Sequence, residues 1–125
     1  MNTMLNAFEG DELLALARID IEKGQLDSAL TKLKQALKLD SYPTETPAVA
    51  GRLYAQLRLW DRAKPLLESY LENHPEAINE RFQLGMVSFD SGDLDSAEMI
   101  WDSFLKTHPT HPPALFYSGL LQAQK

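Results

Sequence analysis

Apolar residues recur along the chain at the three- and four-residue spacing of an α-helix face, as Leu13 and Leu16 or Trp101 and Phe104 show. No stretch alternates apolar and polar residues in the manner of a half-buried strand. The pattern predicts an all-α chain with helices at about 11–23, 26–39, 47–58, 61–73, 78–91, 94–107 and 112–124. Residues 1–10 precede the first of these helices, and we expect a flexible N-terminal arm there.

Small residues repeat along the chain with a step of 34 positions. One series lies near the start of each expected second helix: Ala29, Ala63 and Ala97. The other series lies on the expected first helices: Ala17, Gly51, Gly85 and Gly119. Small residues on both helices let the two backbones approach where they cross. The repeat therefore predicts three helix pairs and a seventh, unpaired helix.

Turn signals agree with this pairing. Gly24 and Gly92 lie between paired helices, where a glycine ends a helix at little cost, and Arg58 stands at the matching position of the second pair. Three aspartates share the 34-residue step and should open the second helices, as N-caps or as first-turn anions: Asp27, Asp61 and Asp95.

These residues resemble the tetratricopeptide repeat (TPR) family, whose signature is Trp-x2-Leu-Gly-x2-Tyr, then Ala-x3-Phe, then Pro. In the third unit, signature positions carry Leu84, Gly85, Ala97, Trp101 and Pro109. Four positions depart from the pattern: Asp20, Pro47, Arg81 and Ser88. The resemblance covers about residues 11–124 and implies a right-handed superhelix of antiparallel helix pairs. It implies a single domain, 11–125, with repeats at about 10–43, 44–77 and 78–111 and a final helix at 112–124.

Length and composition narrow the class of protein. A chain of 125 residues is one domain by length, and the absence of cysteine excludes disulfides and thiolate chemistry. The net charge of −6 argues against nucleic acid as a partner. No apolar run approaches the ~18–20 residues of a membrane span, and the first residues do not form a secretory signal. We therefore expect a cytoplasmic protein, with the periplasm as the alternative if a signal has been removed.

Motifs for catalysis and cofactor binding are missing from the sequence. It has no phosphate-cradling glycine loop, no nucleophile elbow and no His-Glu-x-x-His pair. His74, His108 and His111 are expected at helix ends, and a metal site on His108 and His111 would need a third ligand from elsewhere. We expect no enzyme activity, no metal and no cofactor.

The TPR resemblance implies that the first helix of each pair lines a concave groove. A stripe offset from the core then gives the candidate partner-binding residues: Arg18, Arg52, Phe82, Met86, Phe89, Phe116 and Leu120. This groove has two arginines in one half and an apolar, partly aromatic other half with a pliant methionine. The Lys and Asn clamp with which relatives hold chaperone tails is absent. The expected function is a protein–protein interaction module or assembly adaptor that binds a peptide or helix.

Three alternatives to this function stay open. In the first, the third unit and the seventh helix bury the apolar half of the groove among themselves, or further helices cover it. Alternatively, the chain self-associates as a homodimer through the same surface, or inserts the apolar arm residues Met4, Leu5 and Phe8 into it. In the last alternative, the chain is a TPR domain cut from a larger multidomain protein.

Overall fold

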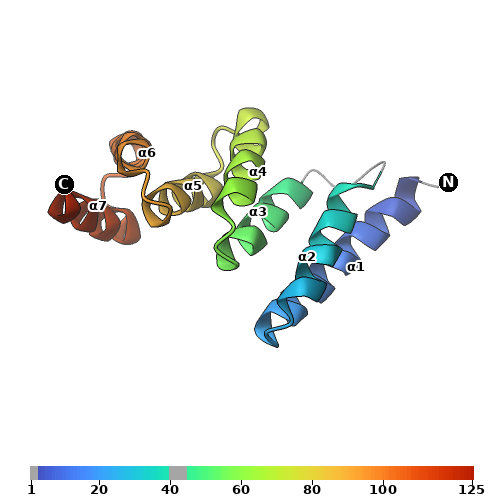
Figure 1. The fold of residues 1–125 in the computed structure, drawn as a ribbon. Helices are drawn as coiled ribbons and strands as arrows, with labels where there is room; N and C mark the ends of the chain where they lie inside the picture. The colour runs from blue at the N-terminus through green and yellow to red at the C-terminus, as the bar shows by residue number, and fades with distance from the viewer. Residues whose placement is uncertain (1–2, 40–44) are drawn as a thin grey trace. The chain divides into compact units, whose positions relative to one another are not determined.

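A computed structural model describes residues 3–39 and 45–125, with the side chains of residues 9–39 and 45–125. These residues form seven α-helices and no strand (Figure 1). The helices are α1 (Thr3–Glu22), α2 (Leu26–Leu37), α3 (Thr46–Gln56), α4 (Trp60–Asn73), α5 (Ile78–Asp90), α6 (Leu94–Thr107) and α7 (Pro112–Gln124). The all-α prediction is confirmed, and α2 to α7 each begin and end within two residues of their predicted bounds.

Helix α1 is longer than the sequence predicts. It begins at Thr3, so helical backbone covers residues where we expected an arm. Gly10 is buried inside the helix, and a methyl group there would lie 3.4 Å from Cδ1 of Leu39. A side chain at this position would therefore be in ordinary van der Waals contact with Leu39, just after α2. The predicted docking of Met4, Leu5 and Phe8 concerns side chains outside those described.

The chain divides into two compact units, residues 1–66 and 67–125, with the boundary inside α4. In the first unit α1 packs against α2, and α3 packs against both. In the second unit α6 packs against α5 and α7, and α7 also contacts α5. Helices therefore contact both the next helix and the next but one, as in a stack of helix pairs. The single domain and the repeat boundaries stay predictions.

Six of the seven repeating small residues are buried, which confirms their assignment to helix crossings. The exception is Gly119 on α7, which is exposed. The closest crossing is at Gly85, where a methyl group would lie 2.7 Å from Cδ1 and 2.8 Å from Cε2 of Trp101 and closer still to Nε1. The Trp101 side chain is completely buried. Only glycine leaves room for the indole at this position.

The three tight turns share one geometry. Gly24, Arg58 and Gly92 have φ values of 77°, 61° and 90°, in the left-handed region. In each turn the residue after this position donates a backbone hydrogen bond to the carbonyl five residues earlier: Gln25 to Asp20, Leu59 to Tyr54 and Asp93 to Ser88, at 2.8–3.0 Å. This is the Schellman closure of a helix, which the sequence predicted at the two glycines and which Arg58 also adopts.

The repeated aspartates lie in the first turns of α2, α4 and α6, so the first-turn alternative is correct. The N-cap of α6 is Asp93, whose carboxylate accepts a hydrogen bond of 3.2 Å from the backbone N–H of Ser96. The N-cap of α7 is His111, whose Nδ1 accepts the N–H of Ala114 at 3.1 Å. Acidic residues thus face the positive ends of the second helices.

A partly buried ion pair links α1 and α2. Asp20 is 8% exposed, and its Oδ2 lies 2.6 Å from Nζ of Lys32. Lys32 also lies 2.6 Å from Oγ of Ser28. The pKa of Asp20 lies below its ordinary value because Lys32 donates a hydrogen bond to the carboxylate and Ser28 adds another. Asp20, a departure from the TPR signature, therefore has a polar partner in place of apolar packing.

Replacing Asp20 with asparagine should destabilise the protein in a pH-dependent way. Because the pKa of Asp20 is lower in the folded than in the unfolded protein, its carboxylate stabilises the fold at pH values above the ordinary pKa of 3.8. This stabilisation is lost as the pH falls through the folded pKa. Asp20→Asn should thus unfold at lower urea concentration than wild type at pH 7, with a gap that narrows towards pH 3. The exposed Asp102→Asn is the control. A gap of the same size at both pH values would contradict the ion-pair interpretation.

Enlarging Gly85 should open the crossing of α5 and α6. Gly85→Leu is expected to lower the free energy of unfolding by at least about 1–3 kcal/mol, because the new side chain overlaps the Trp101 indole. Lys34→Ala, on the exposed face of α2, should stay within about 0.5 kcal/mol of wild type. Urea unfolding measures both. Equal stabilities of the two variants would show that this crossing is not tightly packed.

Candidate functional site

An aromatic cluster lies at the centre of the second unit. Helix α5 contributes Phe82 and Phe89, α6 contributes Trp101 and Phe104, and α7 contributes Tyr117. The ring centroid of Tyr117 lies 5.9 Å from that of Phe82, 6.3 Å from that of Phe89 and 5.7 Å from that of Trp101. The Trp101 centroid lies 6.3 Å from that of Phe82 and 5.7 Å from that of Phe89. The rings meet tilted or edge to face, which is the favourable geometry for aromatic pairs. The cluster therefore holds the three helices together.

The predicted groove residues of α5 form the outer layer of this cluster. Phe82, Met86 and Phe89 pack against a buried core of Ala97, Trp101 and Leu121. Each of the three is half-buried, so one side of each side chain contacts the core and part of it remains accessible. The structure brings these three predicted residues together as one stripe on α5.

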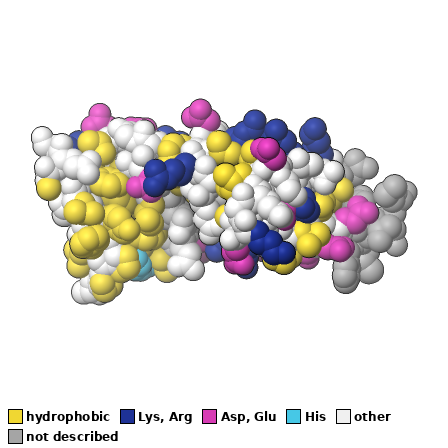
Figure 2. Space-filling model, turned by 60° about the horizontal axis from the view of Figure 1, so that its bottom comes forward, with side chains coloured by type: hydrophobic (Ala, Val, Ile, Leu, Met, Phe, Trp, Pro, Cys, Tyr) yellow, Lys and Arg dark blue, Asp and Glu magenta, His cyan; other side chains and the backbone are white. Residues whose placement is uncertain are grey.

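The predicted groove residues of α7 are much more exposed. Phe116 is 62% exposed and Leu120 is 38% exposed. The Phe116 ring meets the Tyr117 ring of the cluster edge to face, with centroids 5.4 Å apart. Hydrophobic side chains gather over the part of the molecule formed by α5 to α7, at the left in Figure 2, with few charged ones among them. These exposed apolar side chains make this surface the candidate contact site of the second unit.

The two predicted arginines belong to the first unit. Arg18 is exposed on α1, and Arg52 is half-buried on α3, which packs against α1. The other five predicted groove residues lie in the second unit. The two arginines and the five apolar residues therefore lie on different units of the chain.

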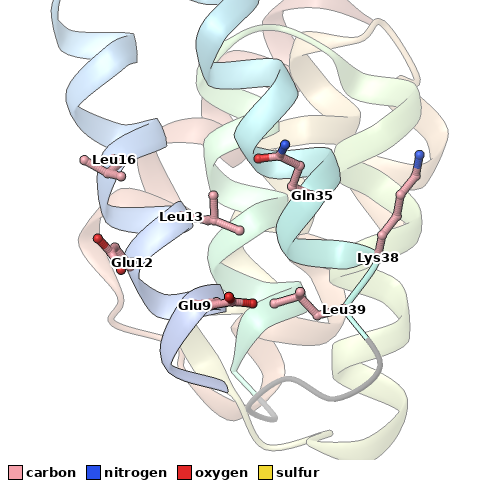
Figure 3. A pocket seen from close by; sticks show the side chains of 7 residues that line it. All are labelled: Glu9, Glu12, Leu13, Leu16, Gln35, Lys38 and Leu39. Atoms are coloured by element: carbon pink, nitrogen blue, oxygen red, sulfur yellow. The ribbon is translucent and has the colours of Figure 1, made fainter. Parts of the chain in front are cut away.

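The first unit also has a cleft that sequence reasoning missed. It lies between α1 and the end of α2 and has a volume of about 510 Å³ (Figure 3). Leu13, Leu16 and Leu39 give it apolar walls, and charged side chains stand around it: Glu9, Glu12 and Lys38. Leu13 and Leu39 point towards the space between the helices. The sequence assigned Leu13 and Leu16 to the core, but Leu16 is 39% exposed.

The histidines contact aromatic rings. His74 stacks on Tyr70 with centroids 4.3 Å apart. His108 stacks on Phe104 at 4.9 Å, and His111 meets the same ring edge-on at 4.8 Å while it caps α7. Across residues 9–39 and 45–125 there is no group of three metal-binding side chains. Within the described ranges, no helix has the length and apolar character that crossing a membrane requires.

A family model of the tetratricopeptide repeat matches residues 50–77. Solved structures with the same fold include MamA AMB-1, with 26% identity and a TM-score of 0.73 over 92% of this chain and 63% of MamA. Residues 50–77 therefore match a tetratricopeptide repeat, and the chain as a whole shares the fold of these solved structures. No curated protein sequence matches it.

Two other TPR structures resemble it in fold. One is YrrB, described as a TPR protein with an unusual peptide-binding site, with 22% identity and a TM-score of 0.72 over 86% of this chain and 56% of YrrB. The other is PcrH in complex with the chaperone binding region of PopB, with 20% identity and a TM-score of 0.63 over 93% of this chain and 94% of PcrH. The chain thus spans less than two thirds of MamA and of YrrB.

The sequence analysis did not predict that Tyr117 belongs to the aromatic cluster. Tyr117 lies 34 positions after Gln83, so the repeat aligns it with a polar residue and gives no sign of its burial. The predicted stripe on the last helix ran through Phe116 and Leu120 instead. In the structure Tyr117 is the residue that joins α7 to the aromatic side chains of α5.

Truncation of Phe82 and Phe116 should have unequal effects on stability. Phe82 contacts Trp101, Phe104 and Tyr117, so Phe82→Ala should lower the free energy of unfolding by about 2–4 kcal/mol. Phe116→Ala removes a mostly exposed ring and should cost less than about 1 kcal/mol. Urea unfolding at low protein concentration measures both. Losses of similar size would mean that Phe116 is as well packed as Phe82.

Proposed function

We propose that this protein is a non-catalytic interaction module that binds an apolar peptide or helix along α5 and α7. The observation that carries the proposal is the half-burial of Phe82, Met86 and Phe89 on one stripe, with the exposed Phe116 and Leu120 on the neighbouring helix. The cluster beneath holds the stripe in place without covering it. A ligand side chain therefore meets a pre-formed apolar surface, which lowers the entropic cost of binding.

The chemistry of these side chains suits a peptide with apolar anchors. Large aromatic residues provide most of the binding energy at protein interfaces, because they bury a wide area with few rotatable bonds. Met86 adds an adaptable side chain between Phe82 and Phe89, one helical turn from each. We expect the ligand to place apolar residues at helical or extended spacing against this stripe.

The fold neighbours support this kind of function. YrrB is described as having a peptide-binding site, and PcrH was solved with the chaperone binding region of PopB. We propose that the present chain uses its TPR fold in the same general way. Arg18 and Arg52 belong to the first unit, and we propose that their positive charge accelerates the association of acidic ligands.

Selection of peptides from a random displayed library against the wild-type protein tests the proposal. Selected peptides should be rich in apolar residues, and their fluorescence polarisation should report a dissociation constant at least about tenfold higher for Phe89→Ala or Met86→Glu. The matched control is Met99→Glu, since Met99 is 75% exposed on α6, away from the stripe. Peptides that bind all variants equally well would refute the proposed site.

Reversing the charge of Arg52 tests the role of the basic pair. Arg52→Glu should weaken the capture of selected acidic peptides several-fold at low salt and less at high salt, because salt screens charges that are more than about 10 Å apart at 0.1 M. Polarisation titrations at two salt concentrations measure this. A loss that does not change with salt would mean that Arg52 acts by packing.

A further inference from the structure

The start of α7 is held by His111. Nδ1 of its imidazole accepts the backbone N–H of Ala114 at 3.1 Å, and its carbonyl accepts the N–H of Leu115 at 3.0 Å. The two residues that follow His111 are Pro112 and Pro113, which have no N–H. His111 therefore accepts the first two hydrogen bonds that the backbone of α7 can donate.

The hydrogen bond to the imidazole matters because Ala114 is completely buried. A buried N–H without a partner has lost its bond to water and gained nothing in return. The repeat does not require a histidine at this position, since the matching residue 34 positions earlier is Ala77, which precedes α5 without a side-chain cap. At the start of α7 the chain thus uses a cap that can gain a proton.

The imidazole of His111 also contacts the proposed peptide site. Its centroid lies 5.3 Å from that of Phe82, with the ring planes at 55°. It lies 4.8 Å from the centroid of Phe104, with the two rings edge to face. Phe104 is completely buried, whereas Phe82 is half-buried and belongs to the stripe on α5. One ring therefore caps α7 and supports a residue of the site.

We propose that His111 is a positioning residue of the peptide site, and that peptide binding weakens when its imidazole takes up a proton. This inference rests on the proposed function. The neutral ring with its proton on Nε2 has a lone pair on Nδ1, which accepts the N–H of Ala114. The protonated ring carries a hydrogen on both nitrogens and cannot accept that bond. The cap then opens, and the imidazole that packs on Phe82 shifts with it.

The surroundings of His111 offer no compensation for the added charge. Among the described side chains, no carboxylate forms an ion pair with His111. Helix α7 carries no charged residue, and Tyr117 is its titratable side chain. The ionisable side chains on the adjoining parts of α5 and α6, and just after α6, are Glu80, Arg81, Lys106 and His108. A proton on His111 therefore adds positive charge at the positive end of the α7 dipole.

Peptide affinity at two pH values tests this regulation. The probes are the apolar peptides selected against the wild-type protein that contain no His, Asp or Glu, so that the titrating side chains belong to the protein. Their dissociation constant should rise at least about threefold between pH 7.5 and pH 5.5, because histidine takes up a proton in this range.

Two variants assign the effect to His111. His111→Asn should bind with the same dissociation constant at both pH values, because asparagine is a favoured N-cap that does not titrate. His74→Asn is the matched control, since His74 stacks on Tyr70 of α4, and it should keep the wild-type pH dependence. Equal pH dependence in wild type and His111→Asn, or wild-type affinity that does not change with pH, would overturn the proposal.

NMR on the free protein separates this inference from the proposed function. The amide signal of Ala114 and the ring signals of Phe82 should shift together with those of the His111 imidazole. The hydrogen-exchange protection of the Ala114 amide should fall at least about threefold over the same pH range. If no apolar peptide can be selected, the proposed function fails, and these signals still decide whether His111 positions Phe82. An Ala114 amide that stays protected while His111 titrates would contradict the inference.

Discussion

The packing of the Trp101 indole onto Gly85 is the interaction on which the second unit depends. The indole occupies the space of a side chain that Gly85 lacks, so α5 and α6 approach closely there. Phe82, Phe89 and Tyr117 then surround the indole, which fixes α7 as well. Among the described side chains, the Trp101 Nε1 has no hydrogen-bond partner, so shape holds this crossing without a polar bond. The apolar surface proposed for ligand binding is the outer layer of the same packing.

The first unit also has a close crossing of two helices, and different residues fill it. At the positions of Gly85 and Trp101 it has Ala17 and the smaller Leu33, both completely buried. At the position of Ser88, one turn after Gly85, it has Asp20, which pairs with Lys32. The repeat therefore conserves where helices cross and how each turn closes, while the side chains that fill the crossing vary.

Local signals were enough to predict most of the fold. The spacing of small residues located the crossings, and Gly24 and Gly92 located two turns because a left-handed backbone favours glycine. Helix α1 was underestimated: we expected residues 1–10 to be an arm, whereas the helix begins at Thr3 and includes Gly10. The burial of each candidate-site residue was harder to predict from the sequence, because it depends on how neighbouring helices cover each face. Phe82 and Phe116 looked equivalent in the repeat, but Phe82 also contacts Trp101 and Phe104, whereas Phe116 is 62% exposed.

A double-mutant cycle between Gly85→Ala and Trp101→Leu measures the central interaction most directly. In the wild-type background, Gly85→Ala should destabilise the protein, because its methyl group meets the indole. In the Trp101→Leu background the space is free, so the same change should be neutral or stabilising by up to about 1 kcal/mol, the helix preference of alanine over glycine. A change of sign between the two backgrounds in urea unfolding is the predicted result. An equal loss of stability in both backgrounds would contradict the account.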